Sequence, residues 1–228
     1  MTSAIILCGG KNSRLSNYKK KIIKPLIKFK GKTLLEHHLE KLKKLNFNEI
    51  FINTFKNKNF FLKLKNKNNL NFNIINEIKN TGTAGVVVSN IQKFDETILV
   101  LYGDNYLNMD IRKFYKYFEK NKLSLLIGVF KKKDLSMSGS VKFNIYNTIL
   151  DFKEKDQKYK DKTGYCNAGI YLFKKNFLKN YKKNKFLDFA HDIFSKKIFD
   201  KNCKIYKIKS CKAFDTLELY SKNLTITL

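Results

Sequence analysis

Short apolar runs alternate with amphipathic stretches along the first 130 residues of the chain. Continuous apolar runs of this length are typical of strands that are buried on both faces of a parallel sheet. We expect such strands at Ser3–Cys8, Glu49–Thr54, Phe72–Asn76, Thr97–Tyr102 and Leu123–Phe130. Helical spacing of apolar residues between these runs predicts helices at 34–46, 57–67, 84–91 and 111–119. This alternation predicts a Rossmann-like α/β sheet.

The pattern changes after residue 135, where shorter strands are joined by polar connections. We expect further strands at 139–144, 149–152, 164–173 and 203–208, with helices at 184–198 and 215–224. No repeat or linker separates the two patterns. We therefore predict one domain over 1–228, a three-layer sandwich with a mixed, mainly parallel sheet.

Composition adds a formal net charge of +28 over 228 residues, with 43% hydrophobic residues. Lysines are spread along the whole chain, whereas Arg14 and Arg112 are its two arginines. A nucleic-acid-binding protein needs clustered basic residues and exposed aromatic ones. The aromatic residues here fall mostly into apolar strand and helix patterns, so we expect no nucleic-acid partner.

The four cysteines form no CxxC pair and resemble neither a disulfide framework nor a zinc site. No apolar run has the length of a secretory signal core or a membrane span. We therefore expect a cytoplasmic protein without membrane insertion. The sequence leaves open whether the chain forms a homo-oligomer.

The first candidate for chemistry is the loop after the first strand, which contains Gly9, Gly10 and Arg14 and is followed by Lys24. Glycines after a buried strand let backbone N–H groups approach anionic oxygens. An arginine and a lysine beside such a loop suit phosphoryl or nucleotidyl transfer. The loop matches neither the Walker A pattern nor the dinucleotide-binding pattern. Alone, the loop is better explained as a tight strand-to-helix turn with a surface arginine.

Four other groups are weaker signals when each is taken alone. A small-residue loop, Gly82-Thr83-Ala84-Gly85, precedes a predicted helix, and Asp104 follows a buried strand, where α/β sheets bind ligands. Asp104 could hold Mg²⁺ or form a turn, and Asp215 could be a second Mg²⁺ ligand or a helix N-cap. Glu154-Lys155 and Asn167-Ala168-Gly169 could bind a sugar phosphate, although Lys and Asn are common throughout this chain.

Taken in order, these groups resemble the sugar-1-phosphate nucleotidyltransferase family. The similarity covers nearly the whole chain, and its compact length is most similar to the heptose- and mannose-1-phosphate guanylyltransferase branch. Three positions depart from the family pattern: Asn12 replaces the third glycine of the loop, Ser13 replaces its threonine, and Ile23 replaces the proline before Lys24. Asn tolerates left-handed backbone better than most residues, so the loop can be retained.

The resemblance implies a nucleotide-diphospho-sugar transferase fold, with a nucleotide-binding half at about 1–130 and a sugar-phosphate-binding half at about 135–228. It implies that an NTP and a sugar 1-phosphate react with Mg²⁺ to give an NDP-sugar and pyrophosphate, supplying surface polysaccharide precursors. The implied residues are Arg14 and Lys24 for catalysis; Leu7, Gly9, Gly10, Glu77, Gly82 and Thr83 for the nucleotide; Asp104, Glu154, Lys155, Asn167 and Gly169 for the sugar phosphate; and Asp104 and Asp215 for the metal.

The resemblance favours GTP only weakly, through the 82–85 loop. A UTP- or CTP-dependent enzyme acting on another phosphorylated acceptor is one alternative. A different nucleotidyltransferase on the same fold, such as a molybdopterin guanylyltransferase or a phosphocholine-type cytidylyltransferase, is a second. A catalytically silent regulatory protein that binds nucleotide sugars is another. The presence of both metal aspartates favours an enzyme.

Overall fold

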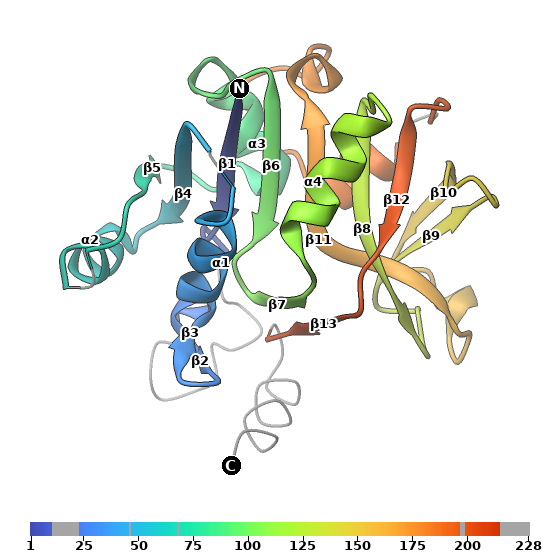
Figure 1. The fold of residues 1–228 in the computed structure, drawn as a ribbon, viewed down its shortest axis with the longest axis horizontal. Helices are drawn as coiled ribbons and strands as arrows, with labels where there is room; N and C mark the ends of the chain where they lie inside the picture. The colour runs from blue at the N-terminus through green and yellow to red at the C-terminus, as the bar shows by residue number, and fades with distance from the viewer. Residues whose placement is uncertain (11–22, 46, 68, 197–198, 215–228) are drawn as a thin grey trace.

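The computed structural model describes residues 1–10, 23–45, 47–67, 69–196 and 199–214 (Figure 1). A mixed sheet runs through this part of the chain in the order β10-β9-β11-β6-β1-β4-β5, and β8 joins β11 to β12. Its strands are β1 (Thr2–Leu7), β4 (Glu49–Phe55), β5 (Asn73–Glu77), β6 (Thr97–Tyr102), β8 (Leu125–Lys132), β9 (Gly139–Phe143), β10 (Ile149–Glu154), β11 (Gly164–Lys174) and β12 (Cys203–Lys207).

Helices cover both faces of the sheet. In Figure 1, α1 (Leu34–Leu42) and α4 (Ile111–Lys120) lie in front of it, and α3 (Gly82–Ser89) lies behind it. Successive side chains of a strand point to opposite faces, so β1 divides its apolar residues between two cores. Ile5 belongs to the core under α3, whereas Ala4 and Ile6 belong to the core under α1, α4 and α2 (Lys58–Lys67). The predicted three-layer α/β sandwich is confirmed.

Strand β11 connects the sheet's two parts. It pairs antiparallel with β6, β8 and β9, and its register on β8 shifts between Asn167 and Tyr171. The parallel strands β5, β4, β1 and β6 come from the first half of the chain. Because β11 pairs directly with β6, the sheet is continuous from one half to the other.

Three features differ from the sequence prediction. The hairpin β2 (Lys28–Phe29) and β3 (Lys32–Thr33), and the pair β7 (Asn105–Asn108) with β13 (Ser210–Ala213), were not expected. The helix predicted over 184–198 is wrong at its start, because helical structure begins at Phe189 as a π-helix that Asp188 caps. A lysine- and asparagine-rich run before Asp188 offers no apolar face to pack. The helix predicted at 215–224 lies outside the described residues.

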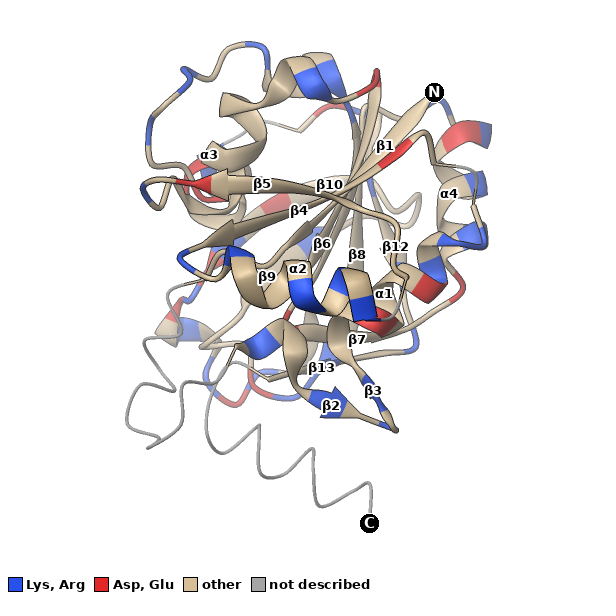
Figure 2. Ribbon diagram, turned by 90° about the vertical axis from the view of Figure 1, so that its left-hand side faces the viewer, with Lys and Arg blue, Asp and Glu red and all other residues tan. Residues whose placement is uncertain are grey.

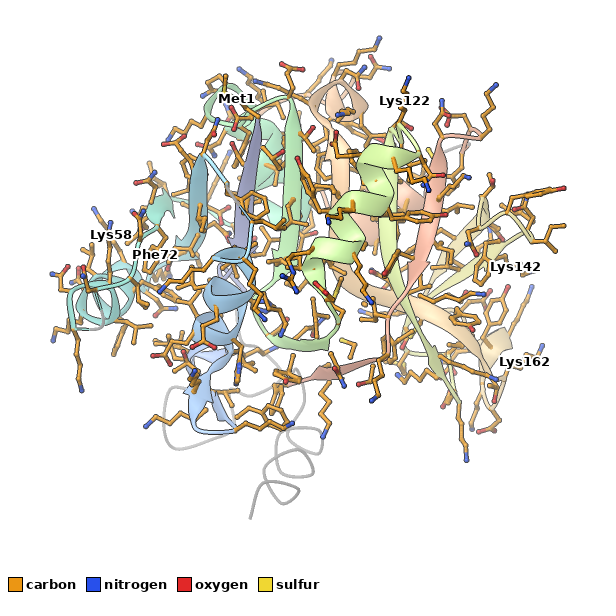
Figure 3. All side chains as sticks on the ribbon, in the orientation of Figure 1. Met1, Lys58, Phe72, Lys122, Lys142 and Lys162 are labelled. Atoms are coloured by element: carbon orange, nitrogen blue, oxygen red, sulfur yellow. The ribbon has the colours of Figure 1, made fainter. Side chains whose placement is uncertain are left out.

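Basic side chains are distributed over many elements rather than gathered on one face (Figure 2). Lys58, Lys122, Lys142 and Lys162, for example, extend outward from separate parts of the fold (Figure 3). This spread is what the scattered lysines of the sequence predicted. Among the described helices, none has both the length and the apolar character that crossing a bilayer requires.

Candidate functional site

A cavity of about 270 Å³ opens at the carboxyl ends of β1, β4, β5 and β6. Ligands of open α/β sheets bind at this edge. The lining includes eight of the residues singled out from the sequence: Leu7, Gly9, Gly10, Lys24, Glu77, Gly82, Thr83 and Asp104. The sheet therefore brings together segments that lie up to a hundred residues apart in the chain.

The wall beside the glycines is built from a hydrogen-bonded chain across three strands. The Cys8 amide donates to Asn53 Oδ1 (2.8 Å), and Asn53 Nδ2 donates to Glu77 Oε2 (2.5 Å). A Cβ on Gly9 would lie 2.8 Å from Glu77 Oε2, closer than side chains pack. Gly9 is thus required so that the backbone and the carboxylate can approach each other.

Glu77, at the end of β5, is also fixed from the far side. Its Oε1 accepts from the Thr81 hydroxyl (2.6 Å) and from the Thr81 amide (3.2 Å). An ionised carboxylate accepts hydrogen bonds and donates none. The cavity therefore has a positioned acceptor in one wall, next to the loop that leads into α3.

Lys24 and Asp104 form an ion pair at the cavity, with Nζ and Oδ2 3.5 Å apart. Their side chains are 13% and 27% exposed, respectively, so the pair is partly shielded from water but still accessible. Lys24 begins a short 3-10 helix, Lys24–Leu26, whose second residue is the chain's one proline. Asp104 follows β6, and the preceding Gly103 donates its amide to the Leu7 carbonyl (3.0 Å). This bond holds the ends of β1 and β6 together.

Cys8 lies beneath this pair but is not suited to nucleophilic chemistry. Burial, and then the charge of Asp104, raise the pKa of its thiol well above the ordinary value. The thiolate is the reactive form of cysteine. Cys8 therefore acts as a small apolar packing residue.

The second half of the chain supplies Phe186 and Asp188 to the cavity, and the sequence analysis had identified neither. Leu187 between them is bound through its backbone. Its amide donates to the Thr81 carbonyl (2.9 Å), and its carbonyl accepts from Ala84 (2.9 Å). The Thr83 hydroxyl donates to Asp188 Oδ2 (2.7 Å). Asp188 carried a local signal as a helix N-cap, whereas nothing in the sequence distinguished Phe186, which is 65% exposed.

The predicted sugar-phosphate residues of β10 and β11 are placed differently. Glu154, Lys155, Asn167 and Gly169 are not among the residues that line the cavity in the described part of the chain. Gly169 has a φ of +71°, and its backbone packs against Tyr102, which does line the cavity. Their role stays a prediction, as do those of Arg14 and Asp215, which lie outside the described residues.

The residues present fit a Mg²⁺ ion in part. Mg²⁺ commonly takes one or two carboxylates and completes its shell with water and substrate phosphates. Asp104 offers one such carboxylate at the cavity. No cluster of three or more His, Cys, Asp or Glu ligands occurs in the described ranges. The Phe214 amide donates to the Asp104 carbonyl (3.0 Å), so the residue before Asp215 lies against Asp104.

Comparison with known proteins places this geometry in context. The family model described as nucleotidyl transferase matches residues 3–213. The chain is 32% identical over 182 residues to the bifunctional protein GlmU of Methanocaldococcus jannaschii, which covers 80% of this chain. The chain spans 42% of the length of that relative.

A second relative has a similar length. It is the D-glycero-alpha-D-manno-heptose 1-phosphate guanylyltransferase of Campylobacter jejuni, 28% identical over 206 residues, covering 85% of this chain and 86% of its own. The crystal structure of HddC from Yersinia pseudotuberculosis complexed with GMP-PN superposes with a TM-score of 0.81. It covers 100% of both chains at 23% identity, which establishes the shared fold.

Proposed function

Because the chain belongs to the nucleotidyl transferase family, we propose that it transfers a nucleotidyl group from an NTP to a sugar 1-phosphate and releases pyrophosphate. The observation that carries the proposal is the Lys24–Asp104 pair at a cavity whose other wall is the Gly9-Gly10 backbone. A cation, a metal-binding carboxylate and backbone N–H groups are the groups that phosphoryl-type transfer needs.

In the proposed reaction, an oxygen of the sugar phosphate attacks the α-phosphorus of the NTP and the bond to pyrophosphate breaks. No general base is needed, because the attacking phosphate is already ionised at neutral pH. Lys24 would orient this phosphate and neutralise charge that develops on the α-phosphate oxygens. Asp104, together with Asp215, would hold Mg²⁺. When bound, the ion supplies further charge neutralisation on the phosphates.

GTP is the nucleotide that we favour. The guanylyltransferase from C. jejuni supports this choice, with a heptose or mannose-type 1-phosphate as acceptor. Glu77 already accepts three hydrogen bonds, two from Thr81 and one from Asn53, so it can take one further donor of the base. UTP or CTP with another phosphorylated acceptor is the second candidate.

A pyrophosphate-release screen tests the proposal. Each of four NTPs would be offered with a panel of sugar 1-phosphates in the presence of Mg²⁺. We expect release with GTP and at least one hexose or heptose 1-phosphate, and loss of release when EDTA is added. Release with no pair, together with tight binding of a nucleotide sugar, would instead support a silent regulatory protein.

The variant Asp104→Asn tests whether the Asp104 carboxylate holds the metal ion. The amide has the same shape but lacks the charge, so we expect pyrophosphate release to fall about 1,000-fold with the fold unchanged. Asp151→Asn is the matched control, because Asp151 lies on β10 and is not part of the cavity. Full activity of Asp104→Asn would remove Asp104 from the metal site.

A further inference from the structure

The middle of β11 departs from regular strand geometry at residues 167–169. Its register on β8 shifts between Asn167 and Tyr171, and none of the described strand pairs includes Ala168. Gly169 has a φ of +71°, and its amide donates to Asn167 Oδ1 (2.8 Å) rather than to a neighbouring strand. The central sheet therefore leaves the Ala168 carbonyl to be bonded by another element.

That element is the small sheet of β7 and β13, which supplies two donors to the Ala168 carbonyl. Asn105 Nδ2 donates to it at 3.0 Å, and Cys211 Sγ, a weaker donor, lies 3.6 Å from it. The two donors come from neighbouring strands, because β7 pairs antiparallel with β13 and Cys211 lies opposite Leu107. A carbonyl oxygen only accepts, so the Asn105 side chain must present its nitrogen to it.

Close packing fixes this contact further. A Cβ on Gly169 would lie 2.7 Å from Asn105 Nδ2 and 2.8 Å from Tyr102 Cγ, closer than side chains pack. Gly169 is thus required both for its left-handed backbone and for the approach of Asn105. The described lining of the cavity includes Tyr102 but not Asn105, whose side chain contacts 168–169 instead.

Asn105 also follows Asp104 directly in the chain. The Asp104 carbonyl accepts from the Phe214 amide (3.0 Å), and Phe214 is buried in a cluster with Phe29. The backbone of Asp104 is therefore held by the segment that follows β13, while the next side chain is held by β11. Through Asn105, the carboxylate that would hold the metal is connected to the segment 167–169.

We propose that Asn105 is a positioning residue that sets the place of the sugar phosphate relative to Asp104. The proposal rests on the proposed function, with Asn167 and Gly169 as sugar-phosphate residues. In that reaction, an oxygen of the sugar phosphate must meet the α-phosphorus in line, and a misplacement of about 1 Å can cost about 100-fold in rate. Asn105 would act through Ala168 and Asp104, without contacting either substrate.

Asn105→Ala removes the donor, and Asn108→Ala is the matched control, because Asn108 is an exposed residue of the same strand. The substrates would be GTP with mannose 1-phosphate, or the pair that the pyrophosphate-release screen selects. We expect Asn105→Ala to raise the KM for the sugar 1-phosphate about 5-fold and to lower kcat about 10-fold. The KM for the NTP should stay within about 2-fold of the wild-type value.

The split between the two KM values separates positioning from a general loosening of the fold. Loosening would raise both KM values together, because the nucleotide residues belong to the same domain. Asn108→Ala should match the wild type in each constant. An unchanged KM for the sugar 1-phosphate in Asn105→Ala, or a parallel rise of both KM values, would overturn the proposal.

Hydrogen exchange of the proteins without substrate tests the placement separately from the reaction. Loss of the Asn105 bond should make the amides of 167–169 exchange about 5-fold faster, with no change at 80–83 beside the cavity. If the wild type releases pyrophosphate with no pair, the proposed function fails, and exchange still decides whether Asn105 places this segment. Unchanged exchange at 167–169 would overturn the proposal in either case.

Cys211→Ala keeps the test decisive if circular dichroism shows that Asn105→Ala does not fold. It removes the weaker of the two bonds to the Ala168 carbonyl. We expect the KM for the sugar 1-phosphate to rise about 2-fold and the KM for the NTP to stay unchanged. Cys211→Ser retains a donor and should restore the wild-type values. Equal KM values for the sugar 1-phosphate in Cys211→Ala and Cys211→Ser would then overturn the proposal.

Discussion

The two halves of the molecule build their shares of the cavity in different ways. In the first half, the parallel strands β1, β5 and β6 all end at one edge, and the site residues follow those ends directly. In the second half, antiparallel neighbours such as β9 and β10 end at opposite edges. That half reaches the cavity through the irregular segment of Phe186 and Asp188. In the parallel part, a site residue is therefore located by its position at the end of a strand. In the antiparallel part, its location depends on the route of the loop that connects two elements.

Among the variants that compare the two halves, the largest effect is expected at Lys24, the cation that the first half of the chain supplies to the cavity. Lys24→Met keeps the aliphatic stem and removes the charge, so stabilisation of the transition state is lost. We expect turnover to fall about 100- to 1,000-fold, with nucleotide affinity largely retained. Steady-state kinetics and calorimetry would check this. Lys28→Met, at an exposed position on β2, is the control that should keep wild-type turnover; normal turnover of Lys24→Met would contradict the assignment.

The next effect concerns the junction of the two halves at Gly82. Its φ is +82°, and a Cβ there would collide with the Leu187 carbonyl. Gly82→Ala should lower the free energy of unfolding by about 3 kcal/mol, through backbone strain and lost bonds to Leu187. Chemical denaturation of the wild type and of Gly82→Ala would measure this difference in the free energy of unfolding.

Gly31→Ala isolates the part of that loss due to strain alone. Gly31 has a similar φ of +78°, but a Cβ there would meet no atom within 4 Å. We expect Gly31→Ala to cost about 1 kcal/mol. Equal losses in the two variants would show that the contact with Leu187 contributes nothing.

We expect His38, in the first half of the chain, to make the free energy of unfolding depend on pH in the acid range. Burial, and then the charge of Lys41, lower the pKa of His38 from 6.5 to about 4. The unfolded chain thus takes up a proton near pH 6.5 that the folded protein takes up only near pH 4. This contribution to stability is present above pH 6.5 and is lost as the pH falls toward 4, with a limit of about 3 kcal/mol.

Urea unfolding at pH 7 and pH 4.5 would measure this loss. We expect His38→Leu to be less sensitive to acid than the wild type. His191→Gln, in the second half, is the comparison variant. His191 is 71% exposed and its Nδ1 lies 3.1 Å from Asp192 Oδ1, so we expect a smaller change in the pH dependence than in His38→Leu. An unchanged dependence in His38→Leu would assign the acid effect to other groups.

The smallest effect is expected at Phe186, where the second half contributes an aromatic ring. Its ring lies at the cavity and is largely exposed, although its neighbour Leu187 is anchored by backbone bonds. Stacking of a base on an aromatic ring contributes about 1–3 kcal/mol, so Phe186→Ala should raise the KM for the NTP about 10-fold. Phe60→Ala, at an exposed position on α2, should leave the KM unchanged. Equal KM values in all three proteins would exclude stacking.

The sequence predicted the sheet well, and it located the first-half residues that line the cavity, for a local reason. Buried parallel strands are continuous apolar runs, and the residues that follow them, such as Gly9, Glu77 and Asp104, are located once the strands are. The pairing of β7 with β13 could not be predicted, because four-residue strands carry little pattern and their partners lie about a hundred residues apart. Phe186 could not be found either, because only the backbone bonds of Leu187 bring it to the cavity.

The late position of β11 in the chain affects how the sheet forms during synthesis. Strand β6 pairs with β1 on one edge and with β11 on the other. Because β6 ends at Tyr102 and β11 begins at Gly164, the second edge stays unpaired until the ribosome has made β11. At synthesis rates of about 5–20 residues per second, the intervening stretch takes about 3–12 s to emerge. An apolar strand with an open edge can pair with other chains during that interval. Fast translation or a chaperone that covers this edge should therefore raise the yield of folded protein.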